Sequence, residues 1–237
     1  MARVLAFDTS ATVTSVAVCD GSRVLAEDDS LSGERHAELL LPRVARCLAQ
    51  AGLPLSDIDA FAVGIGPGSF TGVRVGVATA KGFGLSLHKP VCGVVSLTAL
   101  AHAAADAGGS AWLAPLLDAF KGEVFGALYR VTSAGIALQV EPFHAAPGIA
   151  LARLLAAAEG QRLTLFGAGF RRYVAEFGPL PAGTHVLDPG LDAPRARHVA
   201  HLAAQALAGG EVSELAQLAP LYLRASDARL PKVPLRL

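Results

Sequence analysis

Short apolar runs alternate with polar breaks and glycine-containing turns along roughly the first hundred residues of the chain. Apolar runs of about four to eight residues bounded by turn signals are typical of strands, and apolar positions recurring every three or four residues are typical of helices. These patterns predict strands at residues 3–7, 13–19, 24–28, 60–65 and 91–95, and helices at residues 34–51, 71–87 and 97–107. The predicted order of elements is βββαβαβα.

The second half of the chain repeats the same order of elements. It has predicted strands at residues 112–117, 123–131, 136–141, 163–166 and 185–187, and predicted helices at residues 147–158, 169–177 and 195–208. Asp8 and Asp118 each close the first strand of a half, and they lie 110 residues apart. The hairpin glycines Gly21 and Gly135 lie 114 residues apart. Such a nearly constant offset indicates an internal duplication.

The duplication predicts two α/β domains, each built on a mixed sheet. The stretch AADAGGSA at residues 104–111 is rich in small residues, and it places the boundary between the domains. The first domain is therefore expected to span residues 1–103 and the second residues 104–237. The last predicted helix, at residues 195–208, could pack back on the first domain.

The stretch at residues 60–87 is the most distinctive part of the sequence. A buried strand leads into the turn GPG at residues 66–68 and then into a helix that Ser69 or Thr71 can cap. Along this helix four small residues recur at every fourth position and share one face: Gly72, Gly76, Ala80 and Gly84. This face either packs against the protein's own sheet or receives a helix of a second chain, and the sequence leaves both interpretations open.

This stretch does not match the known nucleotide-binding motifs. A Walker-type phosphate loop needs Gly-Lys-Ser/Thr, whereas Gly72 is followed by valine and arginine. The dinucleotide pattern GxGxxG has Ser69 in place of its third glycine, and the hydrolase elbow GxSxG is not formed either. The turn with Gly66, Gly68 and Ser69 still stands at a helix N-terminus, which can hold an anion.

The hairpin turn that opens each half is a second place for a metal ion or a phosphate. The first turn reads Asp8-Thr9-Ser10 and lacks a glycine that would let a phosphate approach the backbone. The second turn begins at Asp118. The two aspartates could be metal-linked acids, but aspartates at the ends of strands also simply cap turns, and we favour that interpretation.

The composition excludes several classes of protein. With 52% apolar and 17% charged residues, the 237-residue chain is expected to fold compactly. Because it has no net charge, it is not expected to bind nucleic acid by itself. The N-terminus lacks the layout of a signal peptide, and no apolar run reaches the roughly 18 residues of a membrane span. Cys19, Cys47 and Cys92 are widely separated, which fits free thiols better than a disulfide framework. We therefore expect a cytoplasmic protein.

Candidate catalytic side chains are few. His198 and His201 stand three residues apart on a predicted helix, as two metal ligands can, but the sequence offers no obvious third ligand, so a pair on the helix surface is favoured. His36, near the start of the first predicted helix, could be a base or an interface contact. Ser69 has no histidine and aspartate in a recognisable nucleophile order. We therefore expect neither a catalytic residue nor a metal site in this chain.

Several motifs carry a family resemblance. The chain opens with VLAFDTSATVTSVAV, continues with ERH at residues 34–36 and contains GIGPGSFTGVRVGVATAKG at residues 64–82; VSLTALA, DAFKGEVFGALY and PLYLR follow. Over essentially its whole length the sequence resembles the TsaB (YeaZ-like) family of tRNA threonylcarbamoyladenosine biosynthesis proteins. One departure is Phe120, where the family commonly has a basic residue, and this weakens any anion role for the second hairpin.

The resemblance implies a duplicated RNase H-like fold of the actin, sugar-kinase and chaperone-ATPase (ASKHA) superfamily. It also implies a non-catalytic subunit of the bacterial complex that transfers a threonylcarbamoyl group from threonylcarbamoyl-AMP to N6 of the adenosine next to the tRNA anticodon. The implied partners are a paralogous catalytic subunit, TsaD, and a small ATPase, TsaE, with tRNA bound only through the complex. ATP and metal are expected on, or shared with, the catalytic partner, and the chain alone is expected to be a homodimer.

The resemblance also implies that pairing uses the first two helices of the chain. It places the partner or dimer interface on His36, Leu40, Arg43, Val44, Gly72, Val73, Gly76, Ala80 and Gly84. A vestigial nucleotide or anion loop is expected at Asp8, Thr9, Ser10, Gly66, Gly68, Ser69 and Asp118. We expect Gly76→Leu to leave the monomer folded and to abolish pairing, because the new side chain would fill the groove.

Two alternatives remain. An independent ATPase or kinase of the same superfamily would need a glycine in the first turn and an adenosine pocket, and the sequence shows neither. A metallopeptidase would need clustered histidine ligands, for which His198 and His201 are poor support.

Overall fold

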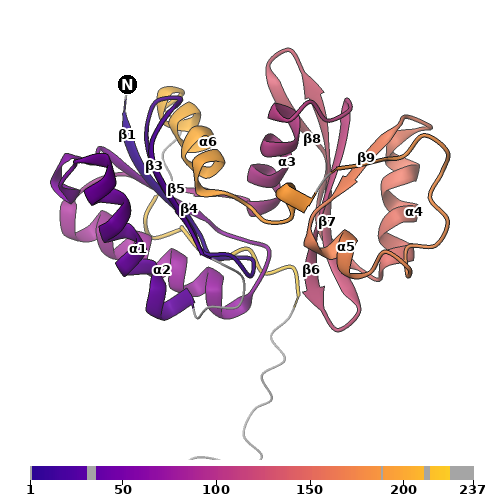
Figure 1. The fold of residues 1–237 in the computed structure, drawn as a ribbon, viewed down its shortest axis with the longest axis horizontal. Coiled ribbons are helices and arrows are strands. Elements are labelled where there is room, and N and C mark those ends of the chain that lie inside the picture. Colours follow the sequence, from indigo (N-terminus) through magenta and orange to yellow (C-terminus); the bar gives the residue numbers. More distant parts are fainter. Residues whose placement is uncertain (1, 31–35, 188, 211–213, 225–237) are drawn as a thin grey trace, which may run out of the picture.

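The computed structural model describes residues 2–30, 36–187, 189–210 and 214–224, and it consists of two α/β halves that lie side by side (Figure 1). The first half contains β1 (Arg3–Asp8), β2 (Ser15–Asp20), β3 (Arg23–Asp29), α1 (His36–Ala51), β4 (Ala60–Gly64), α2 (Phe70–Leu87), β5 (Val91–Val94) and α3 (Ser96–Asp106). The second half contains β6 (Trp112–Phe120), β7 (Glu123–Thr132), β8 (Gly135–Ala145), α4 (Pro147–Ala158), β9 (Leu163–Phe166), α5 (Ala168–Arg172), β10 (His185–Val186) and α6 (Ala196–Ala208). Short 3-10 turns lie at Leu55–Asp57 and Pro189–Leu191.

The two sheets have the same topology. The first has the strand order β3-β2-β1-β4-β5 and the second the equivalent order β8-β7-β6-β9-β10. In each sheet the first strand pairs antiparallel with the second and parallel with the strand that follows the first helix. The predicted duplication of βββαβαβα with a mixed sheet is therefore confirmed, and the fold is a duplicated actin-like, RNase H-like one. The boundary between residues 103 and 104 stays a prediction, because α3 crosses it.

The last helix of each half packs on the sheet of the other half. Ala196, Val199 and Ala203 of α6 join the core of the first sheet, on the face opposite α1 and α2. Leu97 and Leu100 of α3 join the core of the second sheet, on the face opposite α4 and α5. The two exchanged helices contact each other at the centre of the molecule (Figure 1).

A late segment of the chain returns to the first half. Leu218 is buried in the core beneath α1 and α2, and the backbone N–H of Leu221 donates to the carbonyl of Ile65 at 2.8 Å. The Tyr222 ring lies 5.2 Å from the Phe70 ring between centroids, at the start of α2. This segment, which carries the PLYLR motif, therefore holds the turn between β4 and α2 from outside.

The small-residue face of α2 packs against the protein's own sheet. A Cβ at Gly72 would lie 2.0 Å from the carbonyl oxygen of Thr9, and a Cβ at Gly76 would lie 2.6 Å from Thr9 Oγ1. A Cβ at Gly84 would lie 2.4 Å from Cγ2 of Val91. The groove is thus filled within the chain, and the hypothesis that this face receives a second chain is wrong.

One helix is shorter than the sequence pattern predicts. The predicted helix at residues 169–177 is the five-residue α5, which ends at Arg172. Its first turn passes so close to β6 that a Cβ at Gly169 would lie 2.4 Å from the carbonyl oxygen of Leu117. The chain leaves the helix at Tyr173, whose hydroxyl donates to Asp118, and Phe177 then packs on Phe170. Among the residues described, no helix is both long and apolar enough to cross a membrane.

One buried and one exposed glycine of α2 should respond to the same substitution with opposite signs. Gly76→Leu should destabilise the chain by about 1–3 kcal/mol or more, because the side chain must displace Thr9 and Val63. A Cβ at Gly82 meets no atom within 4 Å, so Gly82→Leu should stabilise the exposed helix by up to about 1 kcal/mol. Urea unfolding of both variants measures the difference, and equal effects would contradict the packing described above.

Candidate functional site

The site suggested by the duplicated turns is a narrow cleft between the two halves. A cavity of about 110 Å³ separates the β1–β2 turn and the start of α2 from the β6–β7 turn and α5. Its lining consists of Ser10, Ala11, Thr12, Ser69, Leu117, Asp118, Phe120 and Ala168. The structure therefore brings together four residues of the predicted anion loop or its second-half counterpart: Ser10, Ser69, Asp118 and Phe120.

The carboxylate of Asp8 is buried and is held by its own half. Its Oδ1 accepts hydrogen bonds from the backbone N–H of Ser10 at 2.8 Å and from the Ser10 hydroxyl at 2.6 Å. Its Oδ2 accepts from the hydroxyl of Ser96, at the start of α3, at 2.7 Å. A Cβ at Gly64 would lie 1.8 Å from this Oδ2, so only glycine at the end of β4 leaves room for the carboxylate.

The GPG turn closes over the first hairpin. The backbone N–H of Ser69 donates to the carbonyl of Ser10 at 2.7 Å, and a Cβ at Gly68 would lie 2.1 Å from the same oxygen. The hydroxyl of Ser69 caps α2 by accepting from the N–H of Gly72 at 3.3 Å. Two N–H groups that an anion would need are thus already bonded within the chain, which reduces the capacity of this helix N-terminus as an anion site.

Asp118 repeats the first-half turn in the second half. Its Oδ1 accepts from the backbone N–H two residues ahead, at Phe120, at 2.8 Å, as Asp8 does with Ser10. The Tyr173 hydroxyl donates to Oδ1 at 3.0 Å, and Arg172 lies 2.8 Å from Oδ2. Both aspartates therefore cap their turns, as the sequence favoured.

The second turn has an unusual backbone. Phe120 and Lys121 have φ angles of 60° and 54°, and Gly122 follows at 79°. Non-glycine residues adopt this left-handed region at a cost of about 1 kcal/mol or more, so the turn must be fixed by its surroundings. Arg224 of the late segment donates to the carbonyl of Ala119 at 3.0 Å and supplies one such contact. Phe120 stays half exposed at the mouth of the cleft.

Most of the predicted interface residues lie inside the first half. Gly72, Gly76, Ala80 and Gly84 face the sheet, and Leu40, Val44 and Val73 belong to its hydrophobic core. These seven side chains or glycine faces are covered within the chain, so the prediction that they contact a partner directly is corrected. The helical periodicity was identified correctly, but the face it defines is the inward one. The side chain of His36, at the start of α1, lies outside the described residues.

Arg43 is an internal link and not a surface residue. It is buried, pairs with Asp28 of β3, and shares this carboxylate with Arg46, whose Nε lies 2.8 Å from Oδ2. Burial alone would raise the pKa of Asp28, but the hydrogen bonds and charges of Arg46 and Arg43 lower it. The pair ties α1 to the edge strand of the first sheet.

One cluster of histidine and aspartate side chains was not predicted from the sequence. His198, half of the predicted histidine pair, is buried, so the favoured place on the helix surface is wrong for this residue. It faces His102 and Asp106 of α3, which lie more than ninety positions earlier in the chain. His102 and Asp106 are spaced four residues apart on one helical face, a pattern that could have been noticed. These two residues lie near α6 only because of the helix exchange, and no local sequence pattern indicates that exchange.

The fold and this cleft together define a class of protein: a duplicated actin-like protein with a narrow cleft between its halves. The family model described as TsaD, tRNA N6-adenosine threonylcarbamoyltransferase, matches residues 30–231. The tRNA threonylcarbamoyladenosine biosynthesis protein TsaB of Escherichia coli is 32% identical over 226 residues, covering 95% of this chain and 96% of that protein. The chain belongs to the TsaB family of tRNA threonylcarbamoyladenosine biosynthesis proteins.

Solved structures agree with this assignment. YeaZ from Pseudomonas aeruginosa matches with a TM-score of 0.82 and 33% identity, covering 94% of this chain and all of that chain. The (R)-2-hydroxyglutaryl-CoA dehydratase component A from Acidaminococcus fermentans matches with a TM-score of 0.52 at 9% identity and covers 88% of this chain. The second match shares the fold alone.

The hydroxyl of Ser96 should be worth more than an ordinary surface hydroxyl. Ser96→Ala removes one donor from the buried Asp8 carboxylate and should lower the free energy of unfolding by about 1–3 kcal/mol. Ser86→Ala, at an exposed position of α2, is the matched control and should change stability by no more than about 0.5 kcal/mol. Urea unfolding would contradict the role of Ser96 if both variants behaved alike.

Proposed function

We propose that this chain is a non-catalytic subunit of the machinery that makes N6-threonylcarbamoyladenosine in tRNA, and that it binds and supports a TsaD-like catalytic subunit. The observation that carries the proposal is the similarity to TsaB along nearly the whole length of both proteins. A TsaE-like ATPase completes the assembly, tRNA is bound only through the complex, and the chain alone forms a homodimer.

The cleft supports a role without nucleotide chemistry in this subunit. Pockets for drug-sized ligands usually measure about 300–1,000 Å³, whereas the cavity between the two turns measures about 110 Å³. The Asp8 carboxylate accepts hydrogen bonds from the hydroxyls of Ser10 and Ser96, and the Asp118 carboxylate forms an ion pair with Arg172. We therefore place ATP and the metal ion of the transfer step on, or shared with, the catalytic partner.

The partner surface follows from the orientation of the first two helices. Both cover the same face of the first sheet, so their outward sides form one continuous solvent-facing layer (Figure 1). On α2 this outward side carries Ala78, Gly82 and Leu85, and on α1 it carries Leu41 and Ala45. We call these five residues the outer face. Leu41 and Leu85 are 56% and 64% exposed, which is high for large apolar side chains.

The outer face suits a helical partner. Its small residues let another backbone approach closely, and its two exposed leucines offer apolar side chains to a partner. This assignment keeps the pairing on the first two helices, but it moves the contact to the side opposite the buried glycines.

A bulky charge on the outer face should prevent pairing without unfolding the chain. Ala78→Arg should weaken binding to a TsaD-like partner, and self-association, by more than about tenfold, since a buried unpaired charge costs several kcal/mol. Ala152→Arg, at an exposed alanine of α4 in the other half, is the matched control and should bind normally. Light scattering on each variant, alone and mixed with the partner, measures the effect.

The outcomes separate two failures of the proposal. Normal binding by the Ala78→Arg variant would move the interface away from the outer face. Failure of the unmodified chain to associate with any TsaD-like partner, even at high concentration, would contradict the subunit role itself.

Nucleotide binding distinguishes the independent ATPase or kinase. ATP with Mg²⁺ should leave the Tm of the isolated chain unchanged, because a ligand that does not bind the native state does not stabilise it. A rise of several degrees at millimolar ATP would favour the independent enzyme. Thermal unfolding with and without nucleotide, repeated with ADP as the control ligand, makes this measurement.

A further inference from the structure

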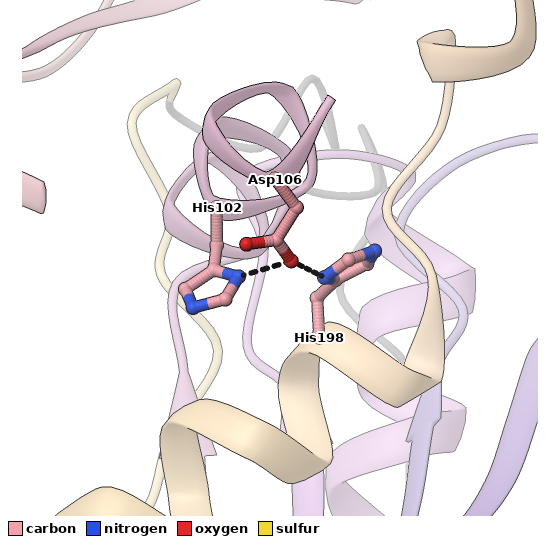
Figure 2. Close-up of side chains that lie close together, drawn as sticks. All are labelled: His102, Asp106 and His198. Carbon is pink, nitrogen blue, oxygen red and sulfur yellow. Dashed lines mark ion pairs between the residues drawn. The ribbon is translucent and has the colours of Figure 1, made fainter. Parts of the chain in front are cut away.

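A cluster of two imidazoles and a carboxylate joins the exchanged helices. His102 and Asp106 project from α3, His198 projects from α6, and the carboxylate of Asp106 stands between the two rings (Figure 2). Asp106 Oδ2 lies 3.2 Å from His102 Nδ1 and 3.5 Å from His198 Nδ1. All three donor atoms lie within 4.8 Å of one another.

The spacing of these atoms fits a tetrahedral metal ion. Bonds of about 2.0–2.2 Å to nitrogen and oxygen place neighbouring ligand atoms of a tetrahedral zinc site roughly 3.3–3.5 Å apart. Two of the three separations in the cluster, 3.2 Å and 3.5 Å, are within about 0.1 Å of this range without any rearrangement. The third requires only that the two imidazole nitrogens approach from at most 4.8 Å.

The hydrogen bonding of the cluster is incomplete. Nδ1 of His102 is buried without a hydrogen bond of good geometry, and the nearest charged group is Asp106 Oδ2 at 3.2 Å. A buried polar atom without a hydrogen bond is costly, and a shared cation would satisfy it. The two rings are also only slightly exposed, at 16% for His102 and 10% for His198.

The imidazoles are in the form that binds metal. Burial lowers the pKa of His102, and burial together with the charge of Arg197 lowers the pKa of His198 to about 4. Both rings are therefore neutral near pH 7 and offer a nitrogen lone pair, while Asp106 supplies a negative charge. Cys19 lines the adjoining cavity, where burial raises the pKa of its thiol to about 12, so this thiol is protonated in the metal-free chain.

We propose that His102, Asp106 and His198 bind one divalent transition-metal ion, for which Zn²⁺ is the best fit, and that this ion clamps α3 to α6. Imidazole and carboxylate ligands in a tetrahedral arrangement suit Zn²⁺ better than Mg²⁺ or Ca²⁺, which prefer six or more oxygens. A water molecule completes the coordination. The proposal is independent of the role in tRNA modification.

The surroundings give the ion a route and one obstacle. A cavity of about 310 Å³ that includes Asp106 and His198 in its lining opens beside the cluster. Arg197 donates from Nε to His198 Nε2 at 3.2 Å, and this contact must break when Nε2 carries the proton of a metal-bound ring. The Arg197 side chain is 47% exposed and already pairs with Glu27 at 3.1 Å, so it can turn aside.

Zinc titration of the chelator-treated full chain tests the proposal. Isothermal titration calorimetry should give one Zn²⁺ per chain, and a hundredfold excess over Kd should raise Tm by about 5 °C. Asp106→Asn and His102→Ala should each weaken binding by more than about tenfold and reduce the rise in Tm at the same Zn²⁺ concentration by about half or more. Co²⁺ in place of Zn²⁺ should give visible absorption bands without a thiolate charge-transfer band.

A matched histidine variant controls for surface binding. His144→Ala changes an exposed histidine of β8 and should leave both the stoichiometry and the Tm response unchanged. The circular dichroism spectrum of each variant without metal shows whether it folds, and Asp106→Asn, at an exposed end of α3, is the variant least able to disturb packing. Absence of stoichiometric binding, unchanged affinity in Asp106→Asn, or a thiolate band with Co²⁺ would each overturn the proposal.

Discussion

Each sheet of this molecule can bury both of its faces only with a helix supplied by the other half. The helices α1 and α2 cover one face of the first sheet, and α6 covers the other; α4 and α5 cover one face of the second sheet, and α3 covers the other. Sheets of mixed or parallel strands are stable when both faces are buried. The helix exchange therefore fixes the relative position of the halves, the width of the cleft between them and the meeting of α3 with α6.

The cleft depends on a second constraint, which is the close approach of two turns. The backbone of the first hairpin touches the GPG turn so tightly that Gly68 and Gly72 have no room for a Cβ. This packing uses Ser10 and Ser69 as internal hydrogen-bond partners. The same aspartate turn recurs in the second half at Asp118, so the duplication preserves a structural device on both walls of the cleft.

Much of the fold could be predicted from the sequence, because strand and helix periods are local properties. The order βββαβαβα, its repetition, and the exact spans 147–158 and 163–166 followed from hydrophobic patterning together with proline and turn signals. The end of α5 did not, because Tyr173 leaves the helix for a hydrogen bond with Asp118, more than fifty residues away. Long-range contacts of this kind leave no periodic signal in the sequence.

The candidate sites were only partly predictable for the same reason. A row of glycines defines a face of α2, but the row cannot say whether a sheet or a second chain lies against it, and Thr9 and Val91 decide the matter here. The aspartate turns were identified with the correct role, because an Asx turn is a local motif. His102 and His198 could be paired only once the helix exchange placed α3 beside α6.

The exchange of terminal helices has a consequence for how such a chain could arise. Two identical half-length chains that traded their last helices would form a domain-swapped homodimer with this same arrangement of sheets and helices. Joining them end to end turns the association into an intramolecular event, at an effective concentration that separate chains rarely reach. Once joined, the two copies no longer need to be identical. One terminal helix can then acquire histidines and the other a histidine and an aspartate, and one pair of helices can keep an exposed outer face while its counterpart diverges.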